Sequence, residues 1–480
     1  MEEKVRRRVI RAFLFGTIGL QTALVATAAE PCMQCIRIRV GVPMVARGPS
    51  PGIPDSQFTA IQLPNGQFRG FSASATTYAI DGAKPWAMGG RAVPVLTPGP
   101  RGAYGESGEW INHVERAGNT LLAWVHDETG DRPGMGLKSM SLATSTNDGL
   151  TWQRVGQIIT GSEPLVPGKV TGEADCSALN GGDGYYYTYC GRVRDHANIV
   201  ARAPVDNPGP GHWMKWFNGT WSQPGLGGDA TAMSTKTAGL ARWVTTGQTL
   251  ALGLVPGGIG LFLSNDHTTF TPLHEPLLPN GPGSWKRPDP SDFSSYFGIM
   301  DVGTGSNQVG DKWMLSYAYI QPNESFGKRY LVFRPIDVWV QSAPVTPQIG
   351  VMLARWLNAG HRARWSTIAA VPPETGFSFE SQAGYLMTSA DQSQPSVELE
   401  ECVQEQSGWT DHLLTQKGEC EGRGYQRQRD AGFVYAKERP NTQPLYQCYA
   451  AADHSHFASN RSDCEGHGSN ERLLGYDLPH

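Results

Sequence analysis

The chain has 480 residues and a formal net charge of −4, with 40 basic and 44 acidic side chains. This near-neutral balance argues against a nucleic-acid-binding protein, which needs a basic face. The 58 glycines and 34 prolines are too many helix breakers for a long-helix protein or a coiled coil. A chain of this length holds two or more domains, or one large β domain with an appendage.

The N-terminal residues 1–28 have the three parts of an export signal. A basic start between Lys4 and Arg11 precedes an apolar run over 12–25, and Ala26–Ala28 reads A-x-A, a cleavage site. A membrane anchor is the alternative, but the run is short and rich in Gly and Thr. Since no later segment is apolar enough to span a bilayer, we expect a secreted or periplasmic protein with no membrane span after cleavage.

The eight cysteines fall into local pairs, and an oxidising compartment favours disulfides between them. Cys32 and Cys35 form a C-x-x-C motif without a βαβ context, so either a structural bridge or free thiols are expected there. Because the pairs are scattered along the chain, a zinc site is disfavoured, and we predict no metal and no cofactor. The predicted disulfides are Cys176–Cys190, Cys402–Cys420 and Cys448–Cys464.

Turns followed by strand-like runs recur between residues 46 and 345. Glycines at 66, 118, 182, 247 and 310, which are 52 to 65 residues apart, each precede an aromatic or aliphatic run. A repeat of this length with four antiparallel strands is typical of propeller blades. We therefore predict an all-β fold, a five-bladed β-propeller over 29–345, with an irregular β-sandwich as the alternative. The expected units are 46–100, 101–165, 166–228, 229–283 and 284–345.

Two turns between units share a short motif. Residues 145–152 read STNDGLTW, which is close to the Asp-box S-x-D-x-G-x-T-W with Asn147 in the Asp place, and 264–270 is a degenerate copy. In such a turn the acidic or amide side chain fixes the local backbone, and Gly149 permits a positive φ. The motif is structural rather than catalytic. A further alternating strand, Ile36–Val40, is expected to close the ring against the last unit.

These features together resemble the five-bladed glycosidases of the arabinanase and fructosidase type, and the Asp-box also resembles sialidases. The resemblance covers about 300 residues. It implies a glycoside hydrolase that acts on an oligo- or polysaccharide. A sialidase would need an arginine triad, for which Arg69, Arg192, Arg242 and Arg287 are available, and a Tyr nucleophile such as Tyr319. Sialidases usually have six blades, so five units argue against that assignment.

The pattern changes after residue 345. Residues 346–384 are expected to be a linker, and 385–480 contain two copies of a unit with a period of about 44 residues, each with its own Cys pair. Such small units need a staple, because they bury little core. Residues 445–449 with Asp453-His454 resemble secreted repeats that carry an LYRCY…DHFYT signature. A cell-wall or envelope glycan is the expected partner of this module.

The catalytic candidates follow from strand geometry. At about 3.3 Å per residue, a side chain some seven to nine places before a hairpin turn lies at the far rim of a blade's inner strand. The acids at this distance are Glu109 in the second unit, Asp175 in the third with Glu173 beside it, and Asp301 in the fifth. Glycoside hydrolysis needs two carboxyl groups, so we predict Glu109 or Glu173 as acid and Asp175 or Asp301 as base. The first unit presents Gln57 where the resemblance would place an Asp base.

The substrate-binding candidates lie at the same predicted rim: His126, Arg192, Tyr319 and Lys236. A non-catalytic envelope protein that binds a glycan or a protein through the same channel is the alternative function. The separation of the carboxyl groups distinguishes the two, because hydrolysis requires them about 5–10 Å apart around one pocket.

Overall fold

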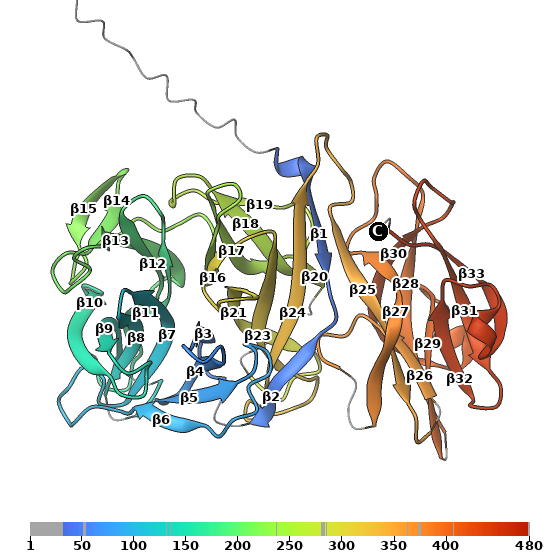
Figure 1. The fold of residues 1–480 in the computed structure, drawn as a ribbon, viewed down its shortest axis with the longest axis horizontal. Coiled ribbons are helices and arrows are strands. Elements are labelled where there is room, and N and C mark those ends of the chain that lie inside the picture. The colour runs from blue at the N-terminus through green and yellow to red at the C-terminus, as the bar shows by residue number, and fades with distance from the viewer. Residues whose placement is uncertain are drawn as a thin grey trace, which may run out of the picture.

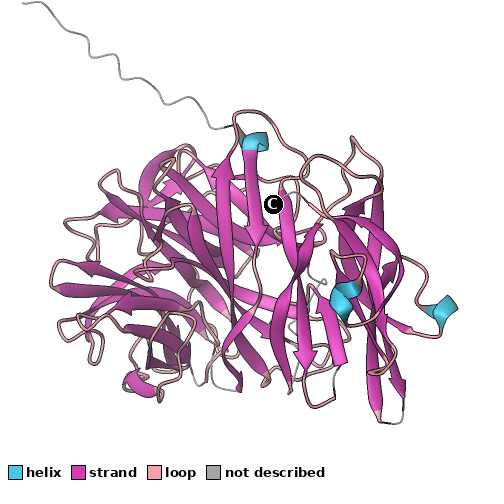
Figure 2. Cartoon of the chain, turned by 45° about the vertical axis from the view of Figure 1, so that its right-hand side comes forward, coloured by secondary structure: helices cyan, strands magenta, loops and turns pink. Residues whose placement is uncertain are grey.

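The computed structural model describes residues 32–478, apart from 51–53, 131, 135, 237, 280–283, 285, 362, 373–375 and 407. The predicted signal segment therefore lies outside the described residues. The described part is all-β, and its helical segments are 3-10 turns at Met33–Cys35, Glu421–Arg423 and Cys464–Gly466 (Figure 2). None of the helices in these residues is long and apolar enough to cross a membrane.

The described strands before residue 349 follow one another in mainly antiparallel groups, coloured from blue to yellow in Figure 1. The first two groups contain β3 (Thr59–Gln62), β4 (Phe68–Ser74), β5 (Thr76–Gly82) and β6 (Val93–Leu96), then β7 (Gly108–Ala117), β8 (Thr120–Thr129), β9 (Leu137–Ser145) and β10 (Gln153–Thr160). The third contains β11 (Thr171–Asn180), β12 (Tyr185–Arg192), β13 (Ala197–Pro204), β14 (Met214–Phe217) and β15 (Thr220–Pro224). β9 pairs in parallel with β11 and joins the second and third groups in one sheet.

The fourth group contains β16 (Ala238–Trp243), β17 (Gln248–Val255), β18 (Gly258–Ser264), β19 (Thr271–Pro272) and β20 (Leu278–Pro279). The fifth contains β21 (Phe293–Asp301), β23 (Lys312–Ile320) and β24 (Arg329–Val340), joined by β1 (Ile36–Val40) and β2 (Met44–Ser50). The pairing of β1 with β24 confirms that Ile36–Val40 lies against the last unit. Between β21 and β23 the chain leaves the fifth group, and β22 (Gln308–Val309) pairs with β16. The first strands of the groups contact each other in the order β3, β7, β11, β16 and β21, and Gln57 before β3 bonds to Phe297 of β21, so we call this arrangement the ring.

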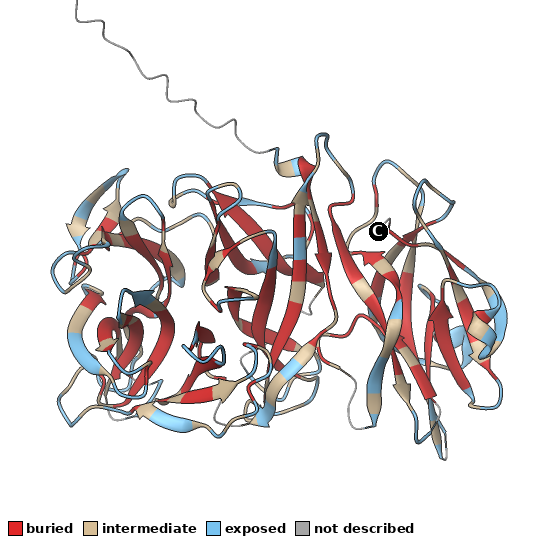
Figure 3. Ribbon diagram, viewed as in Figure 1, coloured by how far each residue is buried: buried red, intermediate tan, exposed pale blue. Residues whose placement is uncertain are grey.

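Tight turns and alternating burial explain why these segments become strands. Gly66, Gly118, Gly182 and Gly247 all have a positive φ at the turn after a first strand, a conformation that glycine adopts without steric cost. The turn at Ser145–Trp152 is held by Asn147, whose Oδ1 accepts the Thr151 amide at 3.1 Å. The strands bury their apolar faces between neighbouring groups, so the core runs around the ring (Figure 3).

The region after the ring is built of three strand units, drawn in orange and red in Figure 1. In each unit the first strand pairs with both the second and the third. The units are β25 (Ile349–Asn358), β26 (Ala363–Thr367) and β27 (Phe377–Met387); β28 (Ser396–Gln406), β29 (Trp409–Gln416) and β30 (Gln426–Tyr435); and β31 (Pro444–Ala450), β32 (Ser455–Ser459) and β33 (Ser469–Tyr476). The predicted linker 346–384 is therefore wrong, since it contains most of the first unit.

The three units repeat each other in detail. Leu353, Leu399 and Leu445 each precede a register shift and face a glycine of positive φ: Gly384, Gly432 and Gly475. The second strands β26, β29 and β32 contact one another pairwise, so the units surround a common axis. The first unit escaped the sequence comparison because Trp356 takes the position that Cys402 and Cys448 hold in the others.

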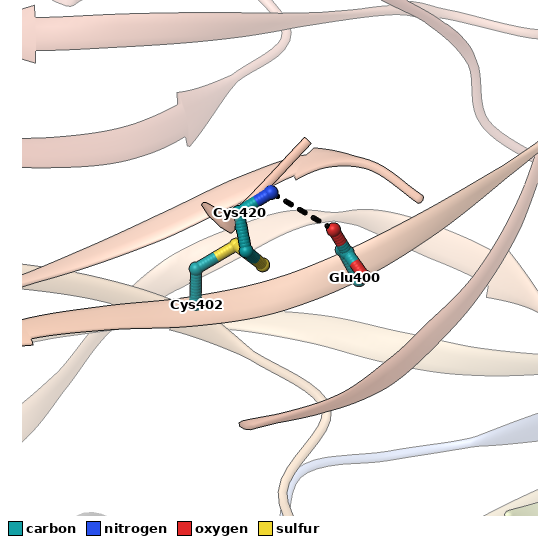
Figure 4. A group of neighbouring side chains, drawn as sticks. All are labelled: Glu400, Cys402 and Cys420. Carbon is teal, nitrogen blue, oxygen red and sulfur yellow. Dashed lines mark hydrogen bonds between the residues drawn. A yellow bond between two sulfur atoms is a disulfide. The ribbon is translucent and has the colours of Figure 1, made fainter. Parts of the chain in front are cut away.

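All eight cysteines lie in the described residues and form four disulfides, which confirms the three predicted pairs and adds Cys32–Cys35. Glu400 lies beside Cys402 and Cys420 and accepts the Cys420 amide at 3.1 Å (Figure 4). Because Cys402 and Cys420 form a disulfide, neither offers a thiolate to a metal, and the group has a structural role.

Candidate functional site

A belt of hydrogen bonds connects the five inner strands, and in β7, β11 and β21 it crosses the middle of the strand. The Gln57 side chain donates to the Phe297 carbonyl at 2.6 Å and accepts from the Ser177 hydroxyl at 2.9 Å. Ser177 Oγ also accepts the Gly239 amide at 3.0 Å, and the Asn112 amide donates to a β11 carbonyl at 3.3 Å. A cavity of about 20 Å³ beside this belt has room for roughly one water. The belt residues therefore lie in one layer across the ring. We call the two open ends of the ring, one on each side of this layer, its mouths.

Backbone strain marks the inner strands at this layer. β11, β16 and β21 each have a register shift here, and φ is +53° at Asp175, +61° at Gly239 and +52° at Tyr296. A left-handed backbone costs a residue with a side chain about 1–2 kcal/mol, and such residues cluster at functional sites. Asp175 and Tyr296 are thus held in a costly conformation just outside the belt, toward the strand entrances.

Asp175 is the centre of a charged cluster at this mouth. Its carboxylate lies 2.7 Å from His126 Nδ1 and 2.9 Å from Lys138 Nζ, and His126 Nε2 lies 3.1 Å from Glu128 Oε1. His126 and Glu128 are buried, whereas the Asp175 side chain is 53% exposed. A carboxylate fixed by two cations and open to solvent is available to a ligand.

The protonation states within the cluster follow from these contacts. Burial alone would lower the pKa of His126, but the carboxylates of Asp175 and Glu128 raise that pKa to about 9. Desolvation would raise the pKa of Asp175, but His126 and Lys138 outweigh it and hold that pKa well below its usual value. At neutral pH Asp175 is therefore ionised and His126 is a cation.

Asp55 precedes β3 and lies at the same mouth. Its Oδ1 accepts from Arg329 at 2.8 Å and from the Tyr296 hydroxyl at 3.2 Å. Desolvation raises the pKa of Asp55, Arg329 opposes that shift, and the nearby charges of Asp175 and Glu128 add to it. The two carboxyl groups at this mouth thus have pKa values shifted in opposite directions. Such a difference suits Asp55 to donate a proton and Asp175 to accept one.

Glu109 and Glu173 do not reach this cluster. Glu109 is buried and paired with Arg154 of β10, 2.7 Å from Nε to Oε1. Glu173 is buried against Lys215 of β14 at 2.7 Å, and Lys215 also donates to two backbone carbonyls. Both acids point into the packing between strands because neighbouring residues of a strand face opposite sides of the sheet. The structure thus places them in internal ion pairs.

Asp301 lies at the opposite mouth, so the prediction that it shares a rim with Asp175 is wrong. It ends β21 and caps the following turn, with Oδ1 accepting the amides of Gly303 and Thr304 at 2.9 and 2.8 Å. The prediction took Gly310 as the hairpin turn. The chain instead turns at Asp301 and runs across to β16 before it returns, so Asp301 and Trp313 are register partners.

The four predicted binding residues also separate. His126 belongs to the Asp175 cluster, whereas Arg192 forms a bidentate pair with Asp195 and donates to the Ala230 carbonyl. Tyr319 is buried within the fifth group, and Lys236 is exposed. The arginines considered for a sialidase triad do not converge either: Arg69 pairs with Asp81, Arg192 with Asp195, and Arg287 with the Ser291 and Gln321 carbonyls.

Three residues of the cluster escaped the sequence reasoning: Asp55, Lys138 and Tyr296. Counting nine residues back from the turn at Gly66 led to Gln57, which lies two residues after Asp55. The count missed Asp55 because the position of the hydrogen-bonded belt, and not the distance from the turn, decides which residues reach the mouth. The sequence signal for Asp55 is its position in Pro54-Asp55-Ser56, directly before a buried run. No sequence pattern marks Lys138 or Tyr296. Their role depends on contacts with residues of other strand groups, Asp175 and Asp55 respectively.

No family model matches the chain, and no curated protein matches it in sequence. Among solved structures it is similar to a family 117 glycoside hydrolase from the marine bacterium Zobellia galactanivorans, with 10% identity, a TM-score of 0.42, and coverage of 64% of this chain and 91% of that chain. The catalytic domain of a Coprinopsis cinerea GH62 alpha-L-arabinofuranosidase has 11% identity, a TM-score of 0.43 and coverage of 64% and 98%. An endo-arabinase from Bacteroides thetaiotaomicron has 11% identity, a TM-score of 0.39 and coverage of 64% and 99%.

Proposed function

We propose that the chain is a glycoside hydrolase-like protein that acts on a glycan at the ring mouth occupied by Asp55 and Asp175. The observation that carries the proposal is the placement of two carboxyl groups at one mouth, Asp175 against His126 and Lys138 and Asp55 against Arg329 and the Tyr296 hydroxyl. The pKa values of the two groups are shifted in opposite directions. Hydrolysis of a glycosidic bond needs one carboxyl group that holds a proton and one that is ionised.

The roles follow from these protonation states. Asp55, whose proton is retained to higher pH, gives it to the glycosidic oxygen as the bond to the anomeric carbon breaks. Asp175 is ionised and supports the attack on that carbon, either by taking a proton from water or directly. His126 and Lys138 orient Asp175, and the Tyr296 hydroxyl and Arg329 orient Asp55.

The proposal includes the finer architecture and the compartment. The five strand groups are five blades of a propeller, the Ser145–Trp152 turn is an Asp-box, and the last three units form a module that holds a cell-wall or envelope glycan. Residues 1–28 direct export, and the four disulfides agree with an oxidising compartment. The protein is then secreted or periplasmic.

The test is hydrolysis of a panel of chromogenic glycosides and oligosaccharides by the purified chain. We expect Asp175→Asn and Asp55→Asn each to lower kcat by about 10²–10⁴-fold, the usual contribution of a positioned acid or base. Asp301→Asn is the matched control, because Asp301 is a half-buried carboxylate at the other mouth, and its substitution should leave kcat unchanged. Full activity in both Asp55→Asn and Asp175→Asn would refute the assignment.

A non-catalytic glycan-binding protein is the second candidate, and one observation favours it. Both His126 and Lys138 contact the Asp175 carboxylate, so its charge is already compensated. This candidate requires saturable binding at the ring mouth without turnover of any glycan in the panel. It also requires that Asp175→Asn weakens binding.

A further inference from the structure

The three units of the C-terminal region repeat one arrangement at the junctions between them. At each junction an arginine, a carboxylate and the hydroxyl that ends a second strand meet. The members are Arg355, Glu465 and Ser459; Arg429, Glu401 and Thr367; and Arg472, Glu419 and Thr415. The hydroxyl donates to the carboxylate at 2.7 Å in all three. The same three kinds of group therefore meet at every junction. Only the hydroxyls come from equivalent positions in all three units, since Glu401 occupies the register position of Arg355.

The three junctions differ in their access to solvent. At the first junction the Arg355 and Glu465 side chains are 3% and 29% exposed. At the second, which faces the ring, Arg429 and Glu401 are 29% and 2% exposed, so each of these pairs has one buried member. At the third junction Arg472 and Glu419 are 31% and 36% exposed. The third triad is thus the one in which both charged groups are partly exposed, and we call its junction the open junction.

A groove of about 610 Å³ lies at the open junction, within the range of about 300–1,000 Å³ that small ligands occupy. A second ion pair joins the triad there, with Arg423 Nη2 3.1 Å from Glu471 Oε2, and both side chains are about one-third exposed. Gln447 lies between the two pairs, accepts from Arg472 at 3.2 Å, and donates to Glu471. The groove therefore presents donors and acceptors side by side.

A sequence difference keeps this junction open. Glu465 is the repeat equivalent of Glu421, since each follows the second cysteine of its unit, and Arg355 is the register equivalent of Gln447. Arg355 holds the Glu465 carboxylate through two nitrogens, at 2.8 and 2.7 Å, and this pair fills the first junction. Gln447 carries no charge to hold Glu421, which is exposed.

A buried histidine stands behind the groove. His456 is 93% buried as a side chain, with Nδ1 2.6 Å from Asp411 Oδ2 and Nε2 3.3 Å from Glu471 Oε2. Its Nε2 lies near the Glu471 carboxylate that lines the groove but forms no hydrogen bond with it. Asp411 therefore holds the His456 ring beside Glu471, whose side chain lines the groove and is about one-third exposed.

The geometry points to a neutral saccharide as the ligand of this groove, bound through adjacent hydroxyls. The lining carries two guanidinium groups and two carboxylates, so an anion would meet Glu419 and Glu471, and a cation would meet Arg423 and Arg472. An apolar ligand would desolvate four charges without compensation. A hydroxyl both donates and accepts, so two neighbouring hydroxyls satisfy an arginine and a carboxylate together. The site lies apart from the ring mouth and does not depend on Asp55 or Asp175.

Ligand-observed NMR and calorimetry on the full chain with neutral arabino-, galacto- and gluco-oligosaccharides test this site. We expect saturable binding of at least one series. The double variant Arg423→Ala/Glu471→Gln should bind it about tenfold more weakly or worse, because charge-assisted hydrogen bonds are removed. The matched control is Arg461→Ala/Asp463→Asn, an exposed ion pair of the same unit that lies outside the groove lining and should leave the affinity unchanged.

The outcomes separate this site from the ring mouth. Binding that survives Asp175→Asn and is lost in the groove variant supports the groove, whatever the result for hydrolysis. Binding that is lost in Asp175→Asn and kept in the groove variant belongs to the ring and overturns the inference. Failure of every neutral series to bind, or preference for uronic-acid oligomers over neutral ones, also overturns it. An unchanged melting temperature shows that the groove variant lost contacts with the saccharide rather than its fold.

Discussion

The ring and the C-terminal units are both built by repetition, but they differ in what they repeat. The C-terminal units bring an arginine, a carboxylate and a hydroxyl together at all three junctions. Three inner strands of the ring, β11, β16 and β21, have a residue of positive φ beside the hydrogen-bonded belt, yet these residues differ: Asp175, Gly239 and Tyr296. Residues that break a repeat are therefore the ones to examine for function.

The largest expected effect on stability comes from a buried ion pair of the ring. Lys215 of the ring is fully buried against Glu173, so Lys215→Ala strands an uncompensated carboxylate and should destabilise the protein by about 3–5 kcal/mol. Arg472→Ala at the open junction removes a pair that is about one-third exposed and should cost about 1 kcal/mol or less. Urea denaturation measures both. Equal losses would contradict the contrast between the ring and the C-terminal units.

An intermediate effect tests the repeated glycines. A Cβ on Gly475 would lie 2.4 Å from Val434 and 2.7 Å from the Tyr435 carbonyl, and its φ of +152° is unfavourable for other residues. We expect Gly475→Ala to cost about 1–3 kcal/mol. Gly422→Ala is the control in the same region, because no atom lies within 4 Å and its φ is not positive. Thermal melts of the two variants should differ clearly, and similar melting temperatures would show that the shared glycine is dispensable.

A third effect, of similar size, depends on pH. The pKa of His126 is about 9 in the folded chain, above the ordinary value near 6.5. Its stabilisation is therefore complete below about pH 6.5 and is lost as the pH rises through about 9. The difference in unfolding free energy between wild type and His126→Gln should shrink by about 2 kcal/mol from pH 7 to pH 10. A constant difference over that range would mean that His126 is not charged in the folded protein.

Local patterns sufficed for the parts of the fold that depend on local interactions. Short turns at Gly66, Gly118, Gly182 and Gly247 and the cysteine spacings identified strands and staples correctly, because hairpins and local disulfides join neighbours in sequence. The prediction of a hairpin turn at Gly310 was wrong because Gln308–Val309, between β21 and β23, pairs with β16 of another group. The first C-terminal unit was missed because Trp356 and Arg364 replace the cysteine and histidine that marked the other two.

The candidate site was only partly accessible from the sequence for the same reason. Asp175 and His126 were found because each lies on a strand whose direction and turn are clear. Asp55 and Lys138 were missed because they act through contacts between groups, which no spacing encodes. Glu109 and Glu173 lie on the inner strands where they were predicted, but they do not face the mouth. Each forms an ion pair with a basic residue of an outer strand, Arg154 of β10 and Lys215 of β14.

Strand β1 makes the chain difficult to divide. It pairs antiparallel with β24 of the ring and parallel with β25 of the next region, and Ile36, Ile38 and Val40 are buried between them. A fragment that stops before β25 would leave one edge of β1 without its partner, and an open apolar edge recruits other chains. Recombinant pieces of either half are therefore expected to aggregate, and the two halves are best produced as a single polypeptide.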